Sequence, residues 1–486
     1  MPCRHFLFRC VVCLSLWLAC LLAVAGRADG CLPTSVRTLL PLGLPVAEVV
    51  TVDSIEPTYE EAVKPDSFVT GLTIMNATKV PGRLRVWEPD GNLRFDSGAD
   101  ADSLDGMTIR VRGNNSALQP LKPYKVKLRH KADLLCRGNE RHYADKNWLL
   151  LKEKQFSLNI PIGFKVNELL DFAWTPAYEY VNLLFNGEFR GVYLLTEQVR
   201  RASCRIDVDE QTGFIIERDI YWWVEGTLSF ESKLYHGFWQ RYTFKYPEQE
   251  DVTEADLGYI RTAVNEMEDA VARGEGYSEY MDVNSFASWT LGHDLLGTKD
   301  SGGANRYLVK YDNTPDSKFC MGPLWDFDSN FGTAGVWTEL HTDWVGYARR
   351  LFPAKDRTYA YAYIHAWERM YPLLRERMFP FLDSLAISPT GVAIDRSWQE
   401  EARFRQRPYV SVADNVAKAK AWFSDREYWI NSHLGEVDEM GIQVGVEDLA
   451  ARNTVPVQCF DLMGHRLRGR PKAGLYIEGG LLKHAR

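Results

Sequence analysis

Between residues 67 and 202, apolar and polar residues alternate in short runs that are separated by Gly, Pro, Asn and Asp. The run YKVKL at residues 124–128 places Lys125 and Lys127 on the face opposite its three apolar side chains. This alternation predicts antiparallel strands with one buried face. The run IGFKVNELLDFAW predicts a single helix among them. We therefore predict a β-rich lobe over residues 67–202.

From about residue 203 the apolar spacing changes to the helical period. Apolar residues recur every three or four positions in TEADLGYIRTAVNEMEDAVARG, and VNSFASWTLGHDLL, TYAYAYIHAWERMYPLLRERM and NVAKAKAWFSDREYWINSHL also predict helices. Residues 203–436 are therefore predicted to form a helical lobe. The segment 437–486 returns to short apolar runs broken by Gly and predicts a short C-terminal β module. The pattern as a whole predicts an α+β protein.

The first 25 residues have the pattern of a secretory signal peptide. Two basic residues precede an apolar stretch that ends in Ala23-Val24-Ala25, a small-x-small cleavage signature. The stretch is shorter than the roughly 20 apolar residues of a spanning helix, and no later run in the sequence approaches that length. We expect an exported protein, in the periplasm, on the outer surface or secreted, without a transmembrane helix after cleavage. Lipid attachment at Cys20 is an alternative, although Trp17 stands where a small aliphatic residue is preferred.

The segment 26–66 is predicted to be a lead-in that contains one strand, VAEVVTV.

The charge of the chain argues against a nucleic-acid partner, because the net charge is −8 and the basic residues are scattered. Five separated cysteines remain after the predicted cleavage, and none forms a CxxC pair. That spacing excludes a zinc ribbon, and the odd number leaves at least one thiol unpaired.

Polar residues with the spacing of a phosphoryl-transfer site lie near residue 300. Asp300 is followed five positions later by Asn305, and two apolar runs then lead to Asp326 and Asp328. Protein kinases use an Asp and an Asn at this spacing, a later metal-binding Asp, and a Lys from the β lobe. Lys125 is the candidate for that lysine.

Simpler interpretations remain open. An Asp-x4-Asn pattern also fits an Asx-capped loop, Lys125 also fits a solvated strand face, and Glu197 also fits an exposed strand end. The Asp326-x-Asp328 pair also opens a calcium loop, but Phe331 stands where that loop needs Gly. A carbohydrate-active enzyme with two carboxylates facing each other across a Trp-lined groove is a further alternative.

Six blocks in the same order resemble the CotH kinase family, named for spore coat protein H. They are RVRGNNSALQPLKPYKVKLRH, DKNWLLLK, FNGEFRGVYLLTEQV, GFIIERD, HDLLGTKDSGGANRYLVKYD and GPLWDFDSNFG, between about residues 68 and 434. The resemblance implies a two-lobed protein-kinase-like fold, with a β-rich N-lobe and a helical C-lobe. It also implies ATP with Mg²⁺ or Mn²⁺ as cofactors, and Ser or Thr of a secreted or surface protein as the acceptor.

By position, the resemblance assigns each part of the site to residues of this chain. Asp300 becomes the catalytic aspartate, and the metal-binding residues become Asn305, Asp326 and Asp328. Residues expected to contact phosphate are Lys125, with Lys127 as a substitute, together with the loop residues Arg112 and Asn114. Residues 196–199 resemble the hinge that receives adenine, which implicates Glu197 and Val199.

Two features depart from or extend the resemblance. Pro161 interrupts the helix after DKNWLLLK, so the glutamate of the kinase Lys–Glu ion pair stays unassigned, with Glu168 as the nearest candidate. The tail CFDLMGHRL…KAGLYIEGGLLKH resembles a type IX secretion sorting module. The alternative to an active kinase is a surface or coat scaffold that keeps the fold and binds partners without catalysis.

Overall fold

The computed structural model describes residues 35–62, 73–75, 78–98, 104–113, 115–223, 228–235, 241–298, 305–332 and 346–439, and the tail strands at 459–460, 466–467, 474–478 and 481–485. The predicted signal peptide and two predicted site residues, Asn114 and Asp300, lie outside the described residues.

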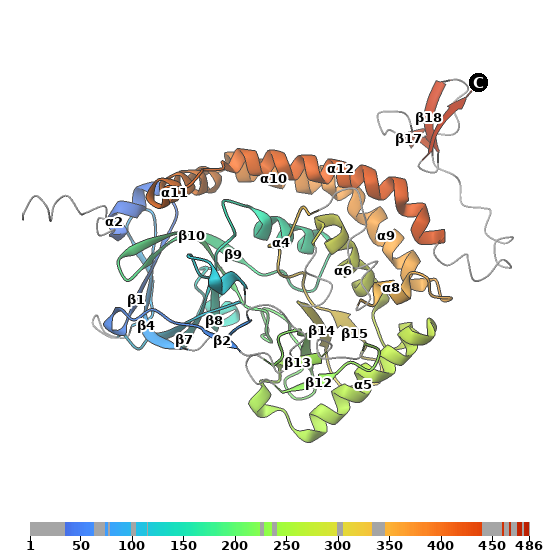
Figure 1. Ribbon diagram of the computed structural model, residues 1–486, viewed down its shortest axis with the longest axis horizontal. Helices are drawn as coiled ribbons and strands as arrows, with labels where there is room; N and C mark the ends of the chain where they lie inside the picture. Colours follow the sequence, from blue (N-terminus) through green and yellow to red (C-terminus); the bar gives the residue numbers. More distant parts are fainter. Residues whose placement is uncertain are drawn as a thin grey trace, which may run out of the picture.

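Seven strands of the described chain close into a barrel (Figure 1). In barrel order they are β1 (Val46–Thr51), β9 (Tyr178–Phe185), β10 (Glu188–Glu197), β8 (Asp145–Leu151), β7 (Tyr124–Ala132), β6 (Met107–Val111) and β4 (Val80–Trp87), and β4 pairs back to β1. An extra strand, β5 (Leu93–Asp96), pairs with β4 outside the closed ring. Only the β1–β9 pairing in this ring of described strands is parallel.

The prediction of a two-lobed protein-kinase-like fold with a β-rich N-lobe is wrong. The strand that overturns it is β1, which the sequence pattern placed in the lead-in segment. Val46 of β1 pairs with Trp87 of β4 on one side and with Asn182 of β9 on the other, so β1 closes the ring. Alternation identifies a strand and its buried face, but it does not say which strand is the partner.

Alternating side chains fill the barrel. Tyr124 of β7 stacks on Phe185 of β9 at 5.2 Å between ring centroids, and Trp148 of β8 is fully buried beside them in the same cluster. The alternate residues of β8 and β10 point outward. Outward-facing Leu149, Leu151 and Leu194 belong to the core of the C-terminal part rather than to the barrel interior. The barrel and the C-terminal part therefore share packing and are not separate lobes.

A second sheet, in the strand order β12-β13-β11-β14-β15 among the described residues, follows the barrel. Its strands are β11 (Phe214–Arg218), β12 (Ser229–Glu231), β13 (Arg241–Tyr246), β14 (Arg306–Lys310) and β15 (Phe319–Met321). The pairings between these strands are antiparallel.

Helices cover this sheet and one side of the barrel. The longer ones are α4 (Asn159–Leu169), α5 (Glu254–Arg273), α6 (Val283–Leu296), α9 (Thr358–Leu373), α10 (Phe379–Ile387), α11 (Pro389–Arg405) and α12 (Val412–Glu439). Figure 1 shows α11, α10 and α12 along one edge of the molecule and α5 at the opposite edge, beside β12 and β13. The ends of α5 follow local rules, since Thr253 caps its first turn and Gly274 ends it at φ 70°. In the described part of the chain, no helix combines the length and the apolar character needed to cross a membrane.

Short elements complete the fold. They are the helices α2 (Val36–Leu39), α3 (Glu140–Tyr143) and α8 (Ala348–Leu351), the 3₁₀ turns η1 (Leu40–Leu42), η2 (Val52–Ser54), η3 (Asn115–Leu118), η4 (Gln249–Asp251) and η5 (Tyr277–Glu279), the π-helical turn η7 (Leu374–Met378), and the pair β2 (Glu60–Ala62) and β3 (Thr73–Met75). The tail holds β16 (Cys459–Phe460), β17 (Arg466–Leu467), β18 (Gly474–Glu478) and β19 (Leu481–Ala485), which form one small antiparallel sheet. A sorting role for this tail stays a prediction.

Candidate functional site

One face of the second sheet carries charged and polar side chains. Glu217 of β11 pairs directly with Thr243 of β13 and Tyr307 of β14, so these three side chains point to the same face. Lys245 forms an ion pair with Glu217 at 2.7 Å. The opposite face carries Tyr242, whose hydroxyl donates to Glu268 of α5 at 2.8 Å. The charged face is therefore the one turned away from α5.

The predicted Asn305 and Asp326 meet at the end of this sheet. Asn305 directly precedes β14, and its Nδ2 donates to Oδ2 of Asp326 at 2.9 Å. Both residues have left-handed backbone conformations, with φ 60° at Asn305 and 64° at Asp326. A non-glycine residue in this region costs about 1–3 kcal/mol, and such residues cluster at functional sites. The structure brings these two predicted residues together, although they lie 21 positions apart in the sequence.

Arg112, which directly follows β6 of the barrel, places a positive charge near this face. Its guanidinium carbon lies 6.0 Å from the ring centroid of Trp325, the residue before Asp326. The pKa of Tyr307 is raised, first by burial and then by the negative charge of Glu217, and Arg112 acts in the opposite direction. The negative charge of Asp326 also raises the pKa of Tyr307. The Tyr307 hydroxyl thus lies within electrostatic range of Arg112, Glu217 and Asp326, which defines the candidate site.

Sequence reasoning missed Glu217. Burial raises the pKa of its carboxyl group, and the positive charge of Lys245 opposes that shift. The available signal was a charged residue in GFIIERD, a strand that is otherwise apolar enough to be buried on both faces. A carboxylate in such a strand needs a partner, and the structure provides Lys245 from the neighbouring strand.

Lys125 and Lys127 lie on the outer face of the barrel, as the alternation predicts. Lys125 is half-buried, and it pairs with Arg110 on one side and Leu149 on the other. Since Leu149 packs into the core of the C-terminal part, this row of side chains is turned toward that part. Lys127 is exposed. Contact of either lysine with phosphate stays a prediction.

Asp328 forms an ion pair with Lys154. Its Oδ2 lies 3.0 Å from Nζ of Lys154, a residue of the loop between β8 and α4. Among the described residues, no three or more His, Cys, Asp or Glu side chains are arranged to hold a metal ion. Mg²⁺ commonly takes one or two carboxylates and completes its shell with phosphate oxygens and water. The Asp326 carboxylate with Asn305 therefore fits a nucleotide-bound Mg²⁺, but not an all-protein metal cage.

Glu197 is not an exposed strand-end residue, because its side chain is 1% exposed. Its carboxylate accepts from Arg137 at 3.0 Å and from Arg205 at 3.2 Å, and also from the backbone N–H of Ala177 at 2.9 Å. Val199 is likewise buried in the core. The carboxylate of Glu197 is held by these barrel contacts, so an adenine contact at residues 196–199 would have to come from other atoms of the segment.

Glu168 pairs with other partners than a strand lysine. Its Oε1 lies 2.7 Å from Lys165 on the same helix and 3.1 Å from Arg377. These pairs are on the surface, where ion pairs contribute little to stability.

His293 of α6 is packed in the core. It is fully buried against Trp289 at 4.4 Å between ring centroids, and its ring nitrogens have no hydrogen-bond partner among the described residues. Burial lowers the pKa of His293 to about 3. The imidazole is therefore neutral in the folded protein at physiological pH.

This neutral histidine predicts acid sensitivity. As pH falls from 6.5 toward 3, the unfolded chain binds a proton at residue 293 and the folded chain does not, so stability falls by about 1.4 kcal/mol per pH unit. We expect His293→Leu to flatten the decline of melting temperature over this pH range. The same substitution at the exposed His365 is the control for loss of a histidine side chain elsewhere in the protein. Equal declines in wild type and His293→Leu would contradict this account.

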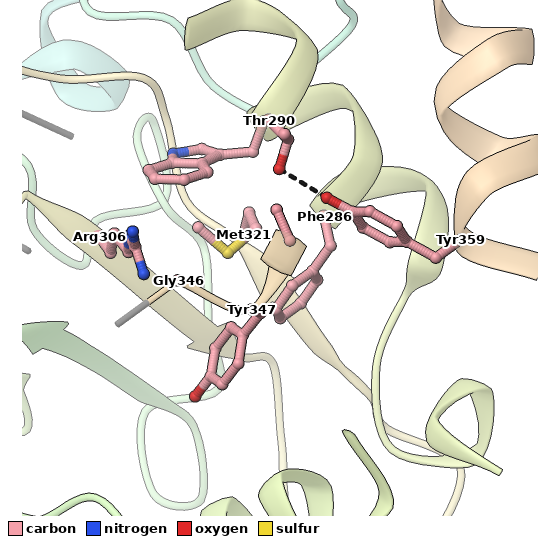
Figure 2. A pocket seen from close by; sticks show the side chains of 9 residues that line it. Phe286, Thr290, Arg306, Met321, Gly346, Tyr347 and Tyr359 are labelled. Carbon is pink, nitrogen blue, oxygen red and sulfur yellow. Dashed lines mark hydrogen bonds between the residues drawn. The ribbon is translucent and has the colours of Figure 1, made fainter. Parts of the chain in front are cut away.

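A small cavity lies on the face of the second sheet opposite the candidate site (Figure 2). Arg306, Met321, Tyr347 and Tyr359 line it, and the hydroxyls of Thr290 and Tyr359 are hydrogen-bonded at 2.7 Å beside it. Its volume of about 20 Å³ has room for one water molecule. The cavity is too small for a nucleotide.

The comparisons with known proteins bear on the family. No curated protein is similar enough to this chain to count as a match. The family model described as CotH kinase protein matches residues 109–429, which is more than half of the chain and spans Arg112, Lys125, Asn305 and Asp326. The chain therefore belongs to the CotH kinase family.

Proposed function

We propose that this protein transfers the γ-phosphoryl group of ATP to Ser or Thr of an exported protein, with Mg²⁺ or Mn²⁺. The observation that carries the proposal is the Asn305–Asp326 hydrogen bond at the sheet face that Arg112 approaches. A carboxylate and an amide supply hard oxygen ligands, and a neighbouring guanidinium supplies positive charge for phosphate. Membership of the CotH kinase family supports the same chemistry.

The roles of the residues follow from charge. Asp326 and Asn305 would hold the metal ion, and Arg112 with Lys125 would neutralise phosphate oxygens. A bound divalent ion supplies charge neutralisation on the β- and γ-phosphates. The resemblance assigns to Asp300 the orientation of the acceptor hydroxyl. Export, an acceptor at the surface, and an adenine contact at residues 196–199 are also parts of this proposal.

The second candidate is a kinase-like scaffold that binds partners without catalysis. The ion pair between Asp328 and Lys154 favours this candidate. Asp328 is engaged in that pair, whereas Asp326 accepts the hydrogen bond from Asn305. A scaffold of this kind would retain the fold and lose phosphoryl transfer.

A transfer assay separates the two candidates. Residues 26–486 are incubated with γ-labelled ATP and Mg²⁺ or Mn²⁺, alone and with a generic Ser/Thr acceptor such as casein. We expect label in Ser or Thr, either of the chain itself or of casein, and loss of that label with EDTA and in Asp326→Ala. Nucleotide binding without any transfer would favour the scaffold.

A further inference from the structure

The loop that carries Asp326 is held in an unfavourable backbone conformation. Asp326 and Phe331 both have left-handed φ values, 64° and 62°, and neither is glycine. Such conformations persist only where the surrounding structure fixes them.

A chain of three side-chain hydrogen bonds connects the loop to two helices. Oγ1 of Thr298, just after α6, donates to Oδ1 of Asn330 at 2.9 Å. Nδ2 of Asn330 then donates to the backbone O of Asn159, the first residue of α4, at 3.3 Å. Nδ2 of Asn159 in turn donates to the backbone O of Phe327 at 3.2 Å. Thr298 is 1% exposed and Asn330 is 8% exposed, so these polar groups depend on one another rather than on solvent.

Backbone contacts fix the two ends of the same loop. The N–H of Phe331 donates to the O of Leu296 at 2.7 Å. At the other end, the N–H of Leu324 donates to Oδ1 of the fully buried Asn167 on α4 at 2.8 Å. Packing adds to this, because a Cβ on Gly163 of α4 would lie 2.3 Å from the Phe327 ring. Both α4 and the end of α6 therefore hold the loop.

We propose that Asn330 is a positioning residue that couples the end of α6 to α4 and thereby fixes Asp326 in its metal-binding position. The inference rests on the proposed function for the role of Asp326. Asn330 lies four residues from Asp326, and it acts through the Phe327 peptide and the turn between them. Its amide suits this role because it accepts from Thr298 and donates to Asn159 at the same time.

The test uses two substitutions at Thr298, in residues 26–486. Thr298→Val removes the hydroxyl donor and Thr298→Ser keeps it. We expect Thr298→Val to raise the Mg²⁺ concentration for half-maximal activity at least about 5-fold, and Thr298→Ser to stay within about 2-fold of wild type. If Thr298 had a purely structural role, Thr298→Val would lower the melting temperature but would leave the metal dependence of activity unchanged. Equal metal dependence in wild type and Thr298→Val would overturn the proposal.

A second readout does not depend on catalysis. Amide hydrogen exchange in the nucleotide-free protein should speed up at Phe331 and Gly332 in Thr298→Val, but not in Thr298→Ser. Asn330→Asp, which keeps the acceptor and loses the donor to Asn159, should give the same acceleration if Thr298→Val fails to fold. Unchanged exchange in both folded variants would overturn the coupling. If the wild type shows no metal-dependent activity but the variants show these exchange changes, the result counts against the proposed function and still supports the coupling.

Discussion

Replacing Asp326 with asparagine is expected to reduce phosphoryl transfer by on the order of 100-fold or more. Asparagine preserves the shape of the side chain but removes the negative charge that would hold a divalent ion. The hydrogen bond from Asn305 is also altered, because the acceptor Oδ2 becomes one end of an amide. The rate is measured with γ-labelled ATP at saturating Mg²⁺, and Mn²⁺ is tested separately. A loss of less than about 3-fold would contradict the metal-binding role.

Asp328→Asn is the matched control for this experiment. The two aspartates are two positions apart, but Asp328 forms its ion pair with Lys154. We expect Asp328→Asn to lose no more than about 10-fold in rate, because its carboxylate forms the ion pair with Lys154. An equal loss in the two variants would favour the sequence-based assignment of both residues to the metal.

Replacing Glu401 with alanine is expected to destabilise the protein by about 3–5 kcal/mol. The carboxylate of Glu401, on α11, is fully buried and lies 2.7 Å from Nζ of Lys152 on the barrel side. It also accepts from the N–H of Val192 at 2.8 Å and from Arg407. Burial lowers the pKa of Lys152, so its positive charge depends on Glu401. Without the carboxylate, the buried Lys152 loses its counter-charge and the Val192 N–H loses its acceptor.

Thermal and urea unfolding of residues 26–486 measure this effect. The double variant Lys152→Met/Glu401→Leu is the control, because it replaces the buried ion pair with apolar groups of similar size and should recover part of the stability. A loss of less than about 1 kcal/mol in Glu401→Ala would show that α11 is not fastened to the barrel through this carboxylate.

The local elements could be predicted from the sequence. The alternation in YKVKL placed Lys125 and Lys127 on the outer face, and the helical period located α5, α6, α9 and α12. Closure of the barrel could not be predicted in this way. It depends on the pairing of β1 with β4 and β9, and β9 begins more than 120 residues after β1. Such long-range pairings leave no periodic signal in the sequence.

The candidate site could be predicted in part. Spacing and resemblance identified Asn305 and Asp326, which the structure brings together, but they did not separate Asp326 from Asp328. The partner of Asp328 is Lys154, and nothing in the sequence indicates that pairing. Glu217 was missed because its role comes from the register of β11 beside β13 and β14.

The proposed function requires a nucleotide and metal site at the sheet face that holds Asn305 and Asp326. This site is tested by the melting temperature of residues 26–486 with and without millimolar ATP and Mg²⁺ or Mn²⁺, beside Asp326→Ala. A ligand that binds only the folded state at 100 times its Kd adds about 2.7 kcal/mol of stability. We predict a metal-dependent rise in melting temperature for wild type and no rise for the variant. No rise in wild type at millimolar nucleotide, or an equal rise in both proteins, would contradict this site.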